Sequence, residues 1–190
     1  MNTTLQAHKF TVDEYHKLSD VGLLQEDERV ELVGGKIIDM APIGSRHASC
    51  VKRLIHLFAE KLKKRGIVSA QDPIQIEEFS ELQPDVALLK YRGDFYAGKH
   101  PTSEDVLLLI EVSDSSLEYD REIKIPLYAG ASVHEVWLVN LMENCVEVYC
   151  CPSGTGYEVA TKFFHKQIVS PTCFPDISLA VDQVVGESSL

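Results

Sequence analysis

Apolar residues recur along the chain with two periods, one typical of helices and one typical of strands. Residues 44–66 carry a single apolar stripe at helical spacing, which predicts a long amphipathic helix that is stopped by Gly66. The stripe consists of Val51, Leu54, Ile55, Phe58 and Leu62. A second helix is predicted at about residues 117–129, just before Gly130. Pro126 lies inside it and should bend it or remove one hydrogen bond.

Short apolar runs predict the strands, the first four at about residues 67–70, 74–78, 85–90 and 106–113. The runs "DVALLK" and "VLLLIEVS" are nearly continuous in apolar residues, which is typical of central strands covered on both faces. Farther along, "HEVWLVNL", "CVEVYCC" and "YEVATKFF" are separated by turn sequences and predict an antiparallel meander.

Three shorter sequence patterns lie toward the N- and C-termini of the chain. Thr11, followed three residues later by Glu14, predicts the capped start of a short helix. The run "RVELVGGKIIDM" predicts a hairpin around Gly34 and Gly35, and "FPDISLAVDQVV" a short final element. The order of all these elements favours an α/β (α+β) fold, in which helices flank a central mixed sheet and an N-terminal helix and β-hairpin precede it.

Length and composition are those of an ordinary globular protein, with 190 residues, 45% hydrophobic and 25% charged, so one domain over residues 1–190 is expected. No apolar run is long enough to span a membrane, and "MNTTLQAHKF" lacks the apolar core of a signal peptide. The cysteines have no metal-ligand spacing, which predicts reduced, mostly buried thiols in a cytoplasmic protein. They are Cys50, Cys145, Cys150, Cys151 and Cys173.

The net charge of −11 argues against broad, non-specific binding to nucleic acid, because neutralisation of phosphates supplies most of that affinity. The one dense basic cluster, "KLKKRG" at residues 61–66, is typical of a solvated helix end. Any role with nucleic acid must therefore be local, or must depend on a metal ion that offsets the repulsion.

Two carboxylates stand at the ends of the most apolar predicted strands. Asp85 follows Pro84 at the start of one, and Glu111 lies 26 residues later near the end of the next. Their hard oxygens suit Mg²⁺ or Mn²⁺, which would polarise a phosphate and supply hydroxide. The alternative is that Asp85 marks a loop-to-strand junction and that Glu111 ends a strand in water.

Lys124 has two interpretations. Asp120 and Lys124 are four residues apart on the second helix, a spacing that suits an exposed ion pair worth about 0.3–0.5 kcal/mol. In the other interpretation, the helix leans back over the strand ends, and Lys124 points at the metal, where it orients water or offsets charge on a phosphoryl group.

Glu31 and His47 are further candidates. Glu31, in "RVELV", is either a satisfied edge-strand residue or a third acidic group near the metal. His47 falls in the first turn of the long helix, where a histidine is usually a surface or capping residue and less often a catalytic one. The other histidines have no metal-ligand spacing, and the chain has no G-x-S-x-G elbow, P-loop or G-x-G-x-x-G fingerprint.

The ordered set of "PD" at 84–85, "IEVS" at 110–113, and Asp120, Lys124 and Tyr128 before "GASVHEVWLVN" resembles the PD-(D/E)XK nuclease superfamily. Within it, the chain resembles the family of restriction-endonuclease-type proteins called Uma-two, abundant in cyanobacteria. The likeness runs from "TVDEYHKL" and "ERVELVGGKIIDMAPIGSRH" to the final strands, and it depends on the order and spacing of motifs that are individually weak.

The resemblance implies a restriction-endonuclease-like core and a Mg²⁺- or Mn²⁺-dependent endonuclease. Asp85 matches the motif aspartate and Glu111 the D/E position, with the Val112 backbone carbonyl as a further metal ligand. Ser113 stands where the motif has lysine, and Lys124 matches a lysine supplied from the following helix. Glu31 matches the acidic residue that precedes the core, and His47 matches a family position. His47, Asp120 and Ser113 are the auxiliary candidates.

The expected substrate is nucleic acid, with DNA favoured, and a homodimer is left open. One rival hypothesis is a non-catalytic binding or accessory protein that retains the nuclease fold, supported by the acidic charge and by Ser113. Another is a metal-dependent hydrolase of a smaller molecule, which an acidic surface tolerates better.

Overall fold

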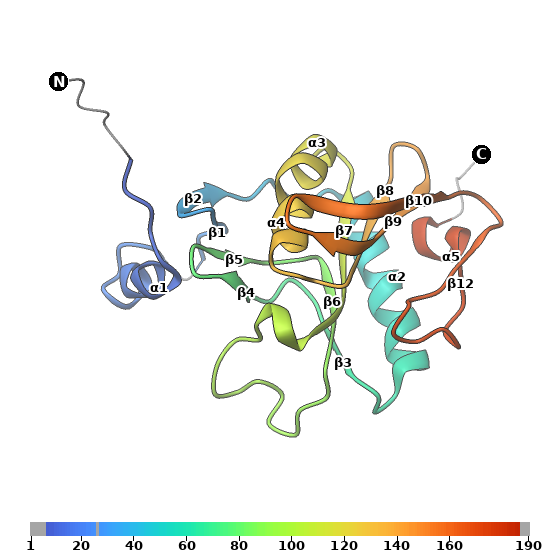
Figure 1. Cartoon of the computed structure of the whole chain (residues 1–190), viewed down its shortest axis with the longest axis horizontal. Coiled ribbons are helices and arrows are strands. Elements are labelled where there is room, and N and C mark those ends of the chain that lie inside the picture. The colour runs from blue at the N-terminus through green and yellow to red at the C-terminus, as the bar shows by residue number, and fades with distance from the viewer. Residues whose placement is uncertain (1–6, 26, 187–190) are drawn as a thin grey trace.

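A six-stranded sheet runs through the centre of the computed structural model, which describes residues 7–25 and 27–186 (Figure 1). Its strands are β3 (Ile67–Ser69), β6 (Val86–Leu89), β7 (Val106–Ser113), β8 (Glu135–Asn140), β9 (Cys145–Ser153) and β10 (Gly156–Phe163). Their order is β10-β9-β8-β7-β6-β3, with β7 and β8 parallel and every other neighbouring pair antiparallel. The predicted mixed sheet and the antiparallel meander of β8, β9 and β10 are confirmed.

A second, four-stranded antiparallel sheet has the order β2-β1-β5-β4. Its strands are β1 (Val30–Val33), β2 (Lys36–Asp39), β4 (Ile74–Glu77) and β5 (Ser80–Leu82). Gly34 and Gly35 connect β1 to β2 with φ angles of 57° and 82°, the left-handed region that glycine adopts without strain, so the predicted hairpin is confirmed. The sequence does not reveal β5, because it is three residues long and only Leu82 in it is apolar.

The long helix α2 (Ser45–Leu62) covers one face of the large sheet (Figure 1). Leu54 and Phe58 from its predicted stripe are fully buried, and each such side chain contributes about 1.5–3 kcal/mol of hydrophobic stabilisation. The helix ends at Leu62 and not at Gly66, because Lys63 already takes a φ of 54°. Gly66 is needed for another reason, since a Cβ there would lie 2.8 Å from the Leu89 carbonyl oxygen.

The opposite face is covered by one continuous helical segment made of α3 (Leu117–Tyr119), η2 (Asp120–Lys124) and α4 (Ile125–Gly130). The segment confirms the predicted second helix. Its middle part, η2, is a π-helical turn, in which the Ile125 N–H donates to the Asp120 carbonyl. Pro126 has no N–H to donate, and its ring crowds the carbonyl four residues earlier, so the widened turn directly before it accommodates the proline.

The remaining elements are short. They are α1 (Val12–Asp20), η1 (Ser103–Asp105), β11 (Ile168–Val169), β12 (Leu179–Ala180) and α5 (Val181–Val185). The capping box that starts α1 is confirmed, because the Thr11 hydroxyl accepts from the Glu14 N–H and the Glu14 carboxylate accepts from the Thr11 N–H. The predicted final element corresponds to β12 and α5, and β12 pairs with β11, which lies before it in the sequence.

All five cysteines are free, as expected, but the prediction that most are buried is wrong. Cys50 and Cys145 are buried, whereas Cys151, near the end of β9, and Cys173, in a loop, are exposed. The predicted domain of residues 1–190 includes residues 1–6, 26 and 187–190, which lie outside the described residues. Among the described helices, none combines the length and the apolar character that crossing a membrane requires.

Candidate active site

A cleft of about 410 Å³ opens at the edge of the large sheet where β6 begins and β7 approaches its end. Its walls are formed by the β1–β2 hairpin, residues 40–44, the start of α2 and the segment after β7. Every predicted site residue lines this cleft except Ser113. The structure therefore brings together residues from β1, α2, the start of β6, the end of β7 and η2.

Asp85 and Glu111 are neighbours because β6 and β7 are antiparallel. Val86 pairs with Ile110, so Asp85, one residue before β6, lies beside the stretch that contains Glu111. The Asp85 Oδ2 atom accepts a hydrogen bond from the Val112 N–H at 2.9 Å. The carbonyl of Val112 points to the same side, because the N–H and C=O of one strand residue share a direction.

Glu111 lies on the face of β7 that the helical segment covers, since Leu109 packs on that face and Ile110 on the opposite one. It is 2% exposed, and its Oε1 atom accepts from the Tyr128 hydroxyl at 2.5 Å. No donor among the described residues reaches Oε2. Burial raises the pKa of the Glu111 carboxyl to about 8, and the charge of Lys124 opposes this shift.

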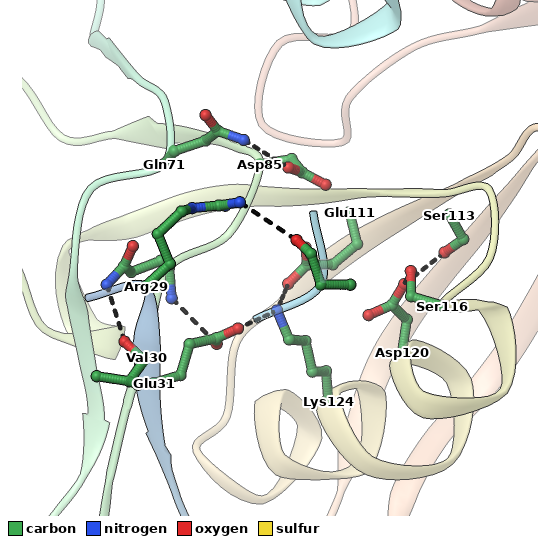
Figure 2. Close-up of polar contacts among 12 residues, drawn as sticks. Arg29, Val30, Glu31, Gln71, Asp85, Glu111, Ser113, Ser116, Asp120 and Lys124 are labelled. Carbon is green, nitrogen blue, oxygen red and sulfur yellow. Dashed lines mark hydrogen bonds and ion pairs between the residues drawn. The ribbon is translucent and has the colours of Figure 1, made fainter. Parts of the chain in front are cut away.

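Lys124 extends from the last residue of η2 into the space between two carboxylates (Figure 2). Its Nζ atom lies 3.0 Å from Glu31 Oε1 and 3.3 Å from Glu111 Oε1, and the side chain is buried. Burial alone would lower the pKa of Lys124, but the charges of Glu111 and Glu31 outweigh it and raise the pKa. Of the two interpretations of Lys124, the structure favours the one that directs it into the site.

Asp120 does not pair with Lys124. Its Oδ2 atom accepts from the hydroxyl of Ser113 at 2.7 Å and from that of Ser116 at 2.6 Å (Figure 2). Ser113 is fully buried behind Asp120 and does not reach the cleft.

Glu31 and His47 each contact another candidate. Glu31 stands on β1, which is an internal strand with β2 and β5 on its sides, so it is not the edge-strand residue of the alternative reading. The Nε2 atom of His47 lies 2.9 Å from Asp85 Oδ2. This hydrogen bond raises the pKa of His47, and burial partly offsets the rise. His47 thus holds Asp85 from the first turn of α2.

The oxygens in the cleft fit a hard divalent cation. Asp85 Oδ1 accepts from a single described donor, Gln71 at 3.2 Å, and so keeps acceptor capacity. Glu111 Oε2 and the Val112 carbonyl are further hard oxygens on the same side of the sheet edge, the ligand type that Mg²⁺ and Mn²⁺ prefer. Glu31 faces the Lys124 ammonium, so its direct contact is to that cation.

A second group of possible metal ligands, at the start of β9, lies outside the cleft, and basic side chains already pair with its carboxylates. Among the described residues, ligand atoms of Glu143, Cys145 and Glu147 lie within 4.8 Å of one another. Lys162 Nζ lies 2.7 Å from Glu143 and 3.3 Å from Glu147, and Arg121 donates to Glu147. These basic side chains already neutralise the two carboxylates.

Sequence reasoning assigned no role to Tyr128, Gln71 or Gln83, all of which contact site carboxylates. Tyr128 had a usable signal, because it stands one helical turn after Lys124 and therefore on the same face. The two glutamines had none, since they reach the site through the tertiary arrangement of the loops before β4 and β6.

Comparison with known proteins gives the family. The sequence model named Uma2, described as "Putative restriction endonuclease", matches residues 12–182. The chain belongs to the Uma2 family. No curated protein matches it. The resemblance to Uma-two inferred from the motifs is confirmed.

A solved structure supports the same fold. The Uma2 chain is similar to a protein from Anabaena variabilis described as "a putative nuclease belonging to DUF820", with a TM-score of 0.71 and 15% identity. The match covers 93% of this chain and 97% of the other. At this identity the likeness establishes the fold alone, which confirms the predicted nuclease-like architecture. The description of the family supports a nuclease-like function, and a nuclease family implies nucleic acid as the substrate and suggests use of a divalent metal.

Proposed function

We propose that this Uma2 protein is a Mg²⁺- or Mn²⁺-dependent endonuclease that hydrolyses phosphodiester bonds of nucleic acid, with DNA favoured, and that the whole chain acts as one domain. The observation that carries the proposal is the meeting of Asp85, Glu111 and Lys124 in one cleft, with the lysine ammonium beside the glutamate. Burial of a carboxylate is energetically costly unless it is paired or binds a cation. Several buried carboxylates in one cleft therefore indicate a functional site.

Asp85, Glu111 and the Val112 carbonyl would hold the cation, which supplies Lewis-acid activation of the phosphate and of water when it is bound. Hydrolysis forms a bond from a water oxygen to phosphorus and breaks the bond to the 3′ oxygen, which leaves with a proton. Lys124 would orient the water or stabilise negative charge that develops on the phosphoryl oxygens. Glu31 holds Lys124, and His47 holds Asp85.

The charge of the protein fits a local contact with its substrate. The net charge of −11 repels a polyanion, and the cleft lining itself has six carboxylates beside the basic Arg29 and Lys124, so a bound divalent cation would supply the positive charge that a phosphate needs there. Association should therefore be weak away from the cleft and should fall as salt is added.

The test uses the purified full chain with labelled single-stranded DNA, duplex DNA and RNA, in Mg²⁺, Mn²⁺ or EDTA. Cleavage in either metal and none in EDTA is expected, with 5′-phosphate ends if the 3′ oxygen leaves. Calorimetric titration with Mn²⁺ should show binding that Asp85→Asn removes. Absence of both metal binding and cleavage on every substrate would favour the accessory-protein hypothesis and overturn this one.

Tyr128→Phe should weaken Mn²⁺ affinity and lower kcat, each by about 10-fold, within the 10–100-fold range typical of residues that hold a metal ligand. The change removes only the hydroxyl that donates to Glu111 Oε1, so the carboxylate is oriented by Lys124 alone. Calorimetry and initial rates measure the two effects. Tyr157→Phe is the control, because the hydroxyl of this half-buried tyrosine donates to the Val133 carbonyl outside the cleft. Equal behaviour of both variants would contradict the role given to Tyr128.

A further inference from the structure

Ser113 occupies the motif position at which the superfamily pattern has lysine, and its environment suggests what it does instead. Its side chain is fully buried, and its hydroxyl donates to Asp120 Oδ2. Ser116, in the loop before the helical segment, donates to the same oxygen. Asp120 is 4% exposed, so a carboxylate charge is held inside the protein by two hydroxyl donors (Figure 2).

Asp120 is also the first residue of the π-helical turn, and Lys124 is the last. A π turn is rare and persists where its surroundings hold it. Two consecutive residues tie this turn to the large sheet: Asp120 to Ser113 on β7, and Arg121 to Glu147 on β9 at 2.6 Å. The start of the turn is therefore fixed at two points, and Lys124 lies at its other end.

We propose that Ser113, Ser116 and Asp120 form a hydroxyl–carboxylate lock that positions Lys124 in the cleft. The lock sets the start of η2 against the end of β7, and so it sets where the Lys124 ammonium lies relative to Glu31 and Glu111. Asp120 is thereby a positioning residue and not a metal ligand. The proposal rests on the proposed function, because the catalytic role of Lys124 is assigned there.

Two variants of Asp120 distinguish a role in positioning Lys124 from a role in binding the metal. Asp120→Ala removes the acceptor of both hydroxyls, and a displaced lysine should lower kcat by about 10–100-fold, with KM and Mn²⁺ affinity changed less than about 3-fold. Asp120→Asn keeps an oxygen that can accept both hydroxyls, so it should restore most of the activity. Glu118→Ala is the matched control, because Glu118 is an exposed carboxylate on α3 in the same helical segment.

A second readout does not depend on cleavage. Lys124 is 5% exposed, so an amine-acylating reagent followed by peptide mass spectrometry should label it slowly in the unmodified protein. Labelling of Lys124 should become several-fold faster in Asp120→Ala and in the double variant Ser113→Ala/Ser116→Ala, and stay slow in Asp120→Asn and Glu118→Ala. Circular dichroism gives the folded fraction by which each rate is divided.

Each outcome supports or overturns the lock. Wild-type activity and slow labelling in Asp120→Ala would overturn it, and so would an Asp120→Asn variant as impaired as Asp120→Ala with weakened Mn²⁺ binding. If the unmodified protein cuts no substrate, the proposed function fails, while the labelling rates still decide whether the three residues hold Lys124 in place.

Discussion

Asp85→Asn is expected to abolish metal-dependent cleavage, with a loss in kcat of at least about 10³-fold. The substitution keeps the shape of the side chain and removes the charge that a divalent cation requires. Electrostatic contacts to the reacting centre are typically worth about 10²–10³-fold each, and loss of the cation removes both activation of water and stabilisation of the phosphate. Initial rates with the best substrate at saturating Mn²⁺ measure the effect.

A matched control separates this effect from a general loss of a carboxylate. Asp94→Asn removes a charge from an exposed aspartate that pairs with Arg92 in the loop after β6. It should leave kcat within about 2-fold. Retention of a tenth or more of the activity in Asp85→Asn, or undiminished Mn²⁺ binding, would contradict the assignment of Asp85 as a ligand.

The part of the site that depends on strands was predictable from the sequence. The runs that contain Asp85 and Glu111 are apolar enough to favour central positions, and β6 and β7 are indeed two of the four interior strands of the large sheet. Strands that follow one another in the sequence tend to be neighbours in a sheet, and the antiparallel pairing of β6 with β7 places the start of one beside the end of the other. Two carboxylates at one sheet edge follow from these facts alone.

The partners of the Lys124 side chain could not be predicted from strand patterns. A spacing of four residues between Asp120 and Lys124 suits an ion pair, yet the structure binds each to a different partner. The difference arises from the π turn and from Ser113, whose buried hydroxyl competes for Asp120. A local spacing rule carries no information about either, because both depend on how the helix packs on the sheet.

The contact between His47 and Asp85 was equally beyond local reasoning. A histidine in a first helical turn is usually a surface residue, and only the position of α2 over the start of β6 brings the ring to Asp85. Gln71 reaches the same aspartate from the loop that precedes β4. The ligands are thus readable from strand patterns, while the residues that orient them come from long-range packing.

The charges in the cleft also show why Lys124 should matter for stability as well as for catalysis. Glu31 and Glu111 are both at most 5% exposed, and the same ammonium contacts both. A buried ion pair adds little net stability, but removal of the ammonium leaves the charge of Glu31, and that of Glu111 above its pKa of about 8, without compensation, at a cost of about 3–5 kcal/mol. A bound divalent cation offsets part of that cost, because it binds the folded state.

Lys124→Met should therefore lower kcat by about 10²–10³-fold and also lower the melting temperature in EDTA, since methionine fills similar space without the charge. Added Mn²⁺ should raise the melting temperature more in this variant than in the unmodified protein. Without the ammonium, the metal ion is the only positive charge that offsets the charge of Glu111. Lys52→Met, at an exposed position on α2, is the control and should change neither quantity measurably. A Lys124→Met protein that is as stable as the control and equally active would mean that the buried carboxylates do not need the ammonium, and the catalytic assignment of Lys124 would fail with it.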